Sequence, residues 1–282
     1  MTALADAPMR MNSLSRDWMR RLGAVGAVLT FTILAVSMLL RIATVFTEDG
    51  RAISTLPPEV ENAARLLHRV SASGIALLTL CTAALCWRHR RSAGHAIAPV
   101  AWIVVSTIVL SVIGPLTPGY RVGLITVLNV TVGMLMLVAF WSLRDCAAIE
   151  ASEVFRSPDR LGQLALVAFL AHVATGAATS AGEMHGIRWL AFLHLALLMP
   201  AMALIVAVTV ARRSEQAASR SIAALVVLLV LQLAFGYSLM KLDVRPLWLA
   251  FLHGLLSPLL AIALVSLGFR HPVGLAVSPR SK

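Results

Sequence analysis

Charged residues are scarce in this chain. Only 13% of its 282 residues are Asp, Glu, Lys or Arg, whereas 59% are hydrophobic, and the mean hydropathy is +0.85. A soluble domain of this length could not bury so much apolar surface in one core. Apolar stretches long enough to cross a bilayer recur along the sequence, which predicts a polytopic helical membrane protein.

Acidic residues are less common than basic ones: the chain has 13 Asp and Glu against 24 Lys and Arg, which gives a formal net charge of +11. Proteins that bind nucleic acid show a similar excess, but they gather their cations on one face. Here the cations lie in short loops and tails between the apolar stretches, where they set membrane topology. Nucleic acid is therefore not an expected partner, whereas membrane lipid is.

Cysteine is also rare, and several motifs of enzyme chemistry are missing. Cys81, Cys86 and Cys146 fall on the predicted cytoplasmic side or in an adjoining span, which argues against an exported disulfide or a redox pair. The sequence contains no His-x-x-x-His zinc motif, no phosphate-binding loop and no nucleophile elbow. These absences leave the histidines as the main candidates for chemistry.

Eight apolar stretches are predicted to be membrane-spanning helices, which makes the fold all-α. Their approximate bounds are 22–44, 63–87, 96–116, 122–143, 161–181, 187–211, 221–240 and 246–269. The first stretch is too long for a signal peptide, lacks a small-residue cleavage site and precedes seven further spans. We therefore interpret it as a retained helix.

The distribution of charge predicts the orientation of the chain. Arginines gather in both tails and in the second and sixth loops, whereas the loop 45–62 carries four acidic residues. The positive-inside bias then places both termini in the cytoplasm and residues 45–62 outside. The predicted segments are a cytoplasmic tail (1–21), a first four-helix half (22–143), a cytoplasmic linker (144–160), a second four-helix half (161–269) and a cytoplasmic tail (270–282).

One hexapeptide, Trp-Leu-Ala-Phe-Leu-His, occurs twice, ending at His194 and again at His253. Both copies begin near the outer end of a predicted span. An ionisable side chain inside a membrane is costly, so it marks a candidate functional site. Two histidines in identical surroundings on neighbouring helices suit axial ligation of a haem iron, although interhelical hydrogen bonding is an alternative role for each.

The first half contains a weaker echo of this pattern. Residues 121–129 and 245–253 both start at an Arg and reach, eight positions later, a polar residue preceded by Leu. The second span contains Arg-Leu-Leu-His, which resembles the end of the hexapeptide. The chain is therefore predicted to form two pseudo-symmetric four-helix bundles with polar positions roughly 8–12 Å deep. These positions are His68, Asn129, His194 and His253.

Other histidines are weaker candidates. Arg69 follows His68 and could pair with a haem propionate or extend to the lipid headgroups. His172 lies in the middle of the fifth span without a repeated partner, so a ligand role is the less favoured interpretation. His185 lies in an outer loop, within reach of a propionate. Three histidines fall in cytoplasmic basic clusters, where a topological role is expected: His89, His95 and His271.

This layout resembles the haem A synthase family across about residues 20–270. The resemblance lies in eight spans, two four-helix halves and a His in the outer part of the even-numbered spans. It implies that His194 and His253 bind a haem b, and that His68 binds the substrate haem O in the first half. It also implies an oxidoreductase that converts the haem O methyl group to a formyl group, giving haem A. A haem O synthase and cytochrome oxidase assembly proteins are the implied partners, with a homo-oligomer as a further candidate.

The substrate half departs from the family pattern at two positions. Asn129 occupies the place of the second His ligand, and an amide is a poor ligand for haem iron. Arg65 stands where the family has a Glu three residues before His68. Glu61 lies two helical turns before His68 on the same face, so it is a candidate replacement that handles protons.

Two functions of different classes follow from these departures. The first is an enzyme of the haem A synthase type. The second is a degenerate member that acts as a membrane cytochrome b or as an oxidase-assembly and haem-handling factor. A solute transporter built from repeats is a third and weaker alternative, since no broken helix is evident from the sequence.

Overall fold

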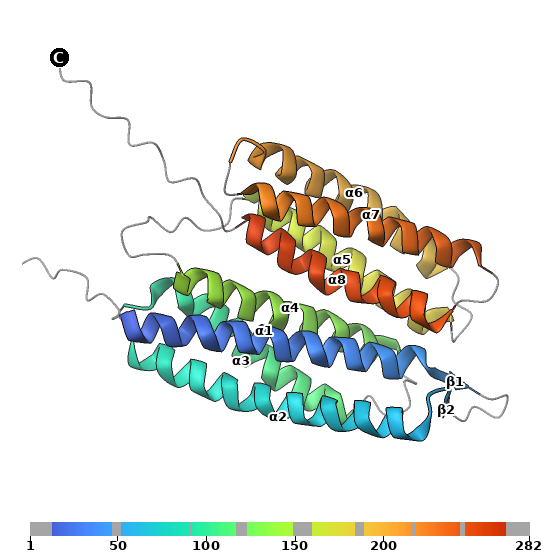
Figure 1. Cartoon of the computed structure of the whole chain (residues 1–282), viewed down its shortest axis with the longest axis horizontal. Helices are drawn as coiled ribbons and strands as arrows, with labels where there is room; N and C mark the ends of the chain where they lie inside the picture. Colours follow the sequence, from blue (N-terminus) through green and yellow to red (C-terminus); the bar gives the residue numbers. More distant parts are fainter. Residues whose placement is uncertain are drawn as a thin grey trace, which may run out of the picture.

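The computed structural model describes residues 13–46, 52–90, 92–116, 123–148, 160–183, 189–215, 218–242 and 246–268. The long helices there are α1 (Ser13–Ile42), α2 (Pro58–Arg88), α3 (Gly94–Ile113), α4 (Gly123–Ala148), α5 (Arg160–Glu183), α6 (Trp189–Arg212), α7 (Ser219–Lys241) and α8 (Leu247–Gly268) (Figure 1). A short 3-10 helix, η1 (Gly114–Leu116), follows α3. Strands β1 (Thr44–Phe46) and β2 (Ala52–Ser54) form an antiparallel hairpin with Val45 opposite Ile53.

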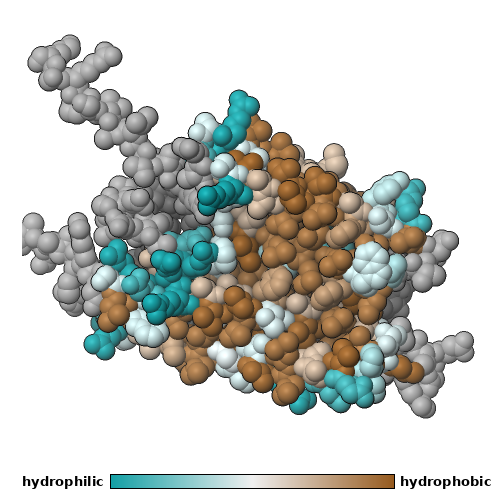
Figure 2. All heavy atoms as spheres, viewed as in Figure 1, coloured by the Kyte–Doolittle hydropathy of each residue, from teal (hydrophilic) through white to brown (hydrophobic). Residues whose placement is uncertain are grey.

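The prediction of an all-α membrane protein with eight spans is confirmed. Within the described ranges, eight helices are long and apolar enough to cross a membrane. Their outward side chains form a broad apolar belt, and polar residues lie toward the two ends of the bundle (Figure 2). The helices run roughly parallel to one another, so this belt follows their middle sections (Figure 1).

Several helices extend beyond the predicted membrane spans. Helix α1 begins at Ser13, so part of the predicted tail 1–21 is helical, and α4 continues to Ala148, inside the predicted linker. Helix α2 begins at Pro58 rather than at 63, with the fixed φ of that Pro suited to a first helical position. The apolar pattern marks only the membrane-embedded part of each helix, which explains these extensions. Residues 1–12, 149–159 and 269–282 lie outside the described ranges.

The helices form two groups that follow the chain. In the first group α1 packs on α2 and α4, and α3 packs on α2 and α4, which makes a ring of four. In the second group α8 packs on α5 and α7, and α6 packs mainly on α5. The groups lie side by side, joined by α4 with α5 and α8, and by α1 with α8 (Figure 1). The pseudo-symmetry of the two halves stays a prediction.

The closest helix contact lies between α1 and α4, near the end of the bundle where α1 begins and α8 ends. We name this the terminal end and name the opposite end, which carries β1 and β2, the hairpin end. A Cβ added at Gly23 would lie 2.7 Å from the Arg144 amide nitrogen and 2.9 Å from the Phe140 carbonyl oxygen. A Cβ added at Gly26 would overlap the ring of Phe140. Glycine is thus required for this approach of two backbones.

The apolar cores of both groups are also concentrated toward the terminal end. The first core contains five fully buried side chains: Met19, Ile103, Leu137, Phe140 and Leu143. The second core joins the start of α5 and α7 to the end of α6 and α8, with Phe169, Val208, Leu225, Leu264 and Leu267 among its members. The helices are therefore densely packed at this end, which leaves the space for a site toward the hairpin end.

Side chains of α1 and α4 join the first half to the second. The Trp141 indole Nε1–H of α4 donates to the Ser266 hydroxyl of α8 over 2.7 Å. Met38 of α1 fills the space beside Gly254 of α8, where a Cβ would overlap its sulfur. Met134 of α4 is buried in the core of the second half. The two groups thus share packing along α1, α4 and α8 and do not behave as separate domains.

Replacing Gly23 with Ala tests the α1–α4 contact. Because the new methyl group would meet backbone atoms, the helices must move apart, and we expect a loss of about 1–3 kcal/mol in stability. The measurement is thermal unfolding in detergent, followed by labelling of the buried Cys86 thiol. Gly94→Ala is the matched control, because nothing lies within 4 Å of its added Cβ. Equal melting temperatures for the two variants would contradict close packing at Gly23.

Candidate functional site

A cavity of about 660 Å³ lies toward the hairpin end. Its walls come from the last turns of α1, α5 and α7 and from the first turns of α4, α6 and α8. Most of the lining surface is apolar, but about a third of the lining residues are polar, including Arg41 of α1. This size and composition are typical of sites that bind a small molecule or a cofactor.

The cavity reaches the apolar outer surface of the protein between α6 and α7. Leu195 of α6 lines the cavity and is also exposed, as are Leu233, Tyr237 and Met240 of α7. These side chains belong to the apolar belt that lipid would cover. A ligand dissolved in the membrane therefore has a direct route to the cavity.

Both histidines of the repeated hexapeptide lie on the cavity wall. His194 comes five residues after the start of α6, and His253 comes six residues after the start of α8. Each side chain is thus roughly 8–9 Å along its helix from the hairpin end. The two imidazoles enter the same space from two different helices.

The aromatic residues of the hexapeptide do not form a shell around this space. Trp189, Phe192 and Trp248 are each more than 60% exposed. Positions two and five residues before a His point to the opposite face of a helix. These aromatic side chains therefore do not surround the two imidazoles, and the two Trp residues occupy the place of membrane-interface anchors.

His194 is paired with His172 of α5. The His194 Nδ1 lies 3.0 Å from the His172 carbonyl oxygen, and the His172 Nδ1 lies 3.1 Å from the His194 carbonyl oxygen. Because a carbonyl only accepts, both Nδ1 atoms donate, and each Nε2 keeps its lone pair. The rings are stacked with centroids 4.0 Å apart and planes 12° from parallel.

His253 has a different partner. The Gln232 side-chain nitrogen of α7 lies 3.5 Å from the His253 Nε2 and donates to the Ser257 hydroxyl over 3.3 Å. The His253 Nδ1 and the Gln232 Oε1 are buried without a hydrogen-bond partner in the described part of the chain. Buried polar atoms in this state are costly, so they mark a place where a ligand could complete the bonding.

A glycine faces each of these two rings. A Cβ on Gly176 of α5 would lie 2.9 Å from the His194 Cε1, and a Cβ on Gly236 of α7 would lie 3.0 Å from the His253 Cε1. Any other residue would push the ring from its present position. Both glycines also line the cavity, so each imidazole lies beside a glycine in the cavity wall.

The first-half candidates are arranged less favourably. His68 does not line the cavity, but its Nδ1 lies 3.1 Å from the hydroxyl of Ser37, which does. Asn129 also lines the cavity. The cavity thus extends from the second half to Ser37, which contacts His68. Of the two first-half candidate ligands, Asn129 lines the cavity and His68 does not.

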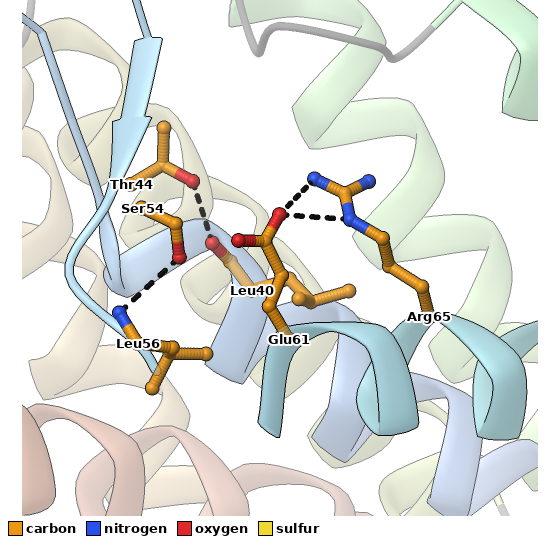
Figure 3. A network of polar contacts seen from close by, with 6 residues as sticks. All are labelled: Leu40, Thr44, Ser54, Leu56, Glu61 and Arg65. Carbon is orange, nitrogen blue, oxygen red and sulfur yellow. Dashed lines mark hydrogen bonds and ion pairs between the residues drawn. The ribbon is translucent and has the colours of Figure 1, made fainter. Parts of the chain in front are cut away.

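Glu61 is engaged by Arg65 at the start of α2 (Figure 3). The Arg65 Nε donates to the Glu61 carboxylate over 2.8 Å, one helical turn away. This pair lies beneath the β1–β2 hairpin and does not line the cavity. The helix does extend to Glu61 as expected, but the carboxylate faces Arg65, and the role of Glu61 stays a prediction.

The remaining candidates lie away from the cavity or outside the described ranges. Arg69 is exposed on α2. His89 bonds the Ser15 hydroxyl at the terminal end over 3.0 Å. His185 and His271 fall on residues that the structure does not describe, as do the two arginines that open the repeats, Arg121 and Arg245.

The sequence alone did not identify the residues that contact the imidazole rings of His194 and His253. His172 had been a weak ligand candidate, and Gly176, Gln232 and Gly236 were not singled out. A signal was present, because α5 contains His-x-x-x-Gly and α7 contains Gln-x-x-x-Gly, each before a span with the hexapeptide. The α5–α6 and α7–α8 helix pairs therefore resemble each other in the sequence of both of their helices.

These residues fit a haem in the second half. Two imidazoles line one largely apolar cavity, His194 has a free Nε2 with its Nδ1 held by a carbonyl, and buried polar atoms at His253 lack partners. A metal-binding His commonly donates its other ring N–H to a backbone carbonyl in this way.

Comparison of the chain with protein-family models and with curated proteins finds no match.

Proposed function

We propose that this protein is an integral membrane haem protein that binds a haem b between His194 and His253. The observation that carries the proposal is the placement of both imidazoles on the wall of one cavity at the hairpin end. The Nε2 atoms of the two rings would hold the haem iron. A haem with two His ligands supplies one-electron transfer.

The protein's own contribution is to hold the ring of His194 and to keep water away. The His172 carbonyl accepts the Nδ1–H of His194, which fixes the tautomer and directs the Nε2 lone pair. The lining that α1, α4 and α8 contribute is largely apolar and also carries the Arg41 guanidinium and the Asn129 amide. The opening between α6 and α7 supports uptake of the haem from the lipid phase.

For the first half we propose the haem A synthase reaction, with His68 binding the substrate haem O. The support is the extension of the cavity to Ser37 and Asn129, which brings the second-half site next to the His68 environment. Conversion of a methyl group to a formyl group with oxygen from water releases four electrons and four protons. We propose that two molecules of a membrane quinone, each reduced to a quinol, take up these four electrons and four protons. We also propose that both protein termini lie on the cytoplasmic side of a bacterial inner membrane.

A non-catalytic haem carrier or cytochrome b is the second candidate function. It is favoured by Asn129, which offers an amide in place of an imidazole, and by the pairing of Glu61 with Arg65. Such a protein would keep the second-half haem and pass electrons or haem to an oxidase-assembly partner. The two functions share the second-half site and differ in the first half.

We expect His194→Ala or His253→Ala to abolish stable binding of haem b, because each change removes one of the two iron ligands. The measurement is the haem-to-protein ratio of purified protein, taken from the reduced pyridine complex. His89→Ala is the matched control, since that ring bonds Ser15 at the terminal end. A full haem complement in either cavity variant would refute the assignment of both axial ligands.

Identification of the extracted haems separates the two functions. In cells that make haem O, we expect the wild-type protein to contain haem B with haem O or haem A, because the enzyme must hold substrate or product. Asn129→His should increase the haem O content, since an imidazole replaces the amide at the cavity wall. Haem B alone in both proteins, measured by chromatography, would favour the carrier and contradict the enzyme.

A further inference from the structure

The two helix pairs of the second half seat their histidines in the same way. On α5, His172 and Gly176 contact His194 of the next helix, and on α7 Gln232 and Gly236 take the equivalent places beside His253. In both helices the polar residue precedes the glycine by four positions, so the two lie on one face. Each pair therefore supplies the imidazole and the residues around it.

The glycines determine where the rings can lie. The nearest atom to an added Cβ at either glycine is Cε1, at the far end of the imidazole. A methyl group there would turn the His side chain and leave the backbones in place. The ring position, and with it the direction of the Nε2 lone pair, thus depends on the absence of a side chain at Gly176 and Gly236.

The polar residues contact the two rings in different ways. His172 stacks on His194 at 4.0 Å and donates its own Nδ1–H to the His194 carbonyl oxygen. The Gln232 side-chain nitrogen lies 3.5 Å from the His253 Nε2, the atom that would bind iron, and the Gln232 backbone also interacts with the His253 ring. The side chain of His172 therefore leaves the Nε2 of His194 open, whereas the side-chain amide of Gln232 occupies the Nε2 of His253 and would give way to iron.

We propose that His172 and Gln232 are positioning residues, each orienting the iron-binding imidazole of the following helix in a slot opened by the glycine one turn away. This inference rests on the proposed haem site. His194 and His253 would hold the haem iron through their Nε2 atoms, and the Gln232 amide would have to leave the Nε2 of His253 for iron to bind there.

The test is a haem titration of the apoprotein in detergent, followed by electron paramagnetic resonance of the ferric form. We expect Gly176→Ala and His172→Leu to weaken haem binding about 10-fold and to shift the low-spin signal, an effect of the size common for groups that orient a metal ligand. Gly176→Ala displaces the His194 ring, and His172→Leu removes the ring stacked on it while the backbone carbonyl of residue 172 still accepts the His194 Nδ1–H. His172→Gln places on α5 the residue that α7 uses. It should bind haem more tightly than His172→Leu and restore the signal.

Gly74→Ala is the matched control, since its added Cβ would lie 3.0 Å from the flexible end of Leu29 and far from any His contact described here. It should match wild type in affinity and spectrum. Wild-type affinity and signal in Gly176→Ala and His172→Leu would overturn the positioning role, while haem loss in His194→Ala would leave the haem site intact as a proposal. If His172→Leu does not fold, Gly176→Ala and His172→Gln decide the question.

Two further results would have separate meanings. Complete loss of haem from His172→Gln, equal to that of His194→Ala, would show that His172 binds the iron itself and would overturn its positioning role. Full haem binding by His194→Ala would refute the proposed function, and the positioning inference would fail with it.

Discussion

Close packing of helices at the terminal end is the constraint on which the rest of the structure depends. Lipid offers no hydrophobic force between helices, so they associate through van der Waals contact where small residues let backbones approach. Gly23 and Gly26 of α1 provide this against α4, and both apolar cores lie toward the same end. Because the helices are joined there, the hairpin end can retain a cavity without loss of the fold.

Polar contacts to the candidate ligands come from within each helix pair. Ser37 of α1 contacts His68 of α2, His172 of α5 contacts His194 of α6, and Gln232 of α7 contacts His253 of α8. A buried imidazole needs a partner for its N–H, and the preceding helix is the nearest source. A helix pair that carries both groups can be duplicated as a unit, which explains why the hexapeptide repeat coincides with a repeat in α5 and α7.

The helices were predictable because apolar length alone identifies a span, and the repeated hexapeptide located His194 and His253. The residues of α5 and α7 that contact these two rings were not predicted, because contacts across a helix pair depend on the rotation of each helix about its own axis. The orientation of Trp189 could have been derived, since five residues before a His is the opposite helix face. The pairing of Glu61 with Arg65, one turn apart, was also within reach of helix geometry.

The shape of the cavity ties the two halves to one function. It runs from His194 and His253 to Ser37 and Asn129, so a ligand in the second half would contact α1 and α4 of the first. Asn129 therefore belongs to the wall of a shared space and not to an isolated second pocket. In the proposed haem protein, its amide would lie beside the haem and would offer the iron no strong ligand. A change at Asn129 would thus alter what the first half accepts without removing His194 or His253 from the second.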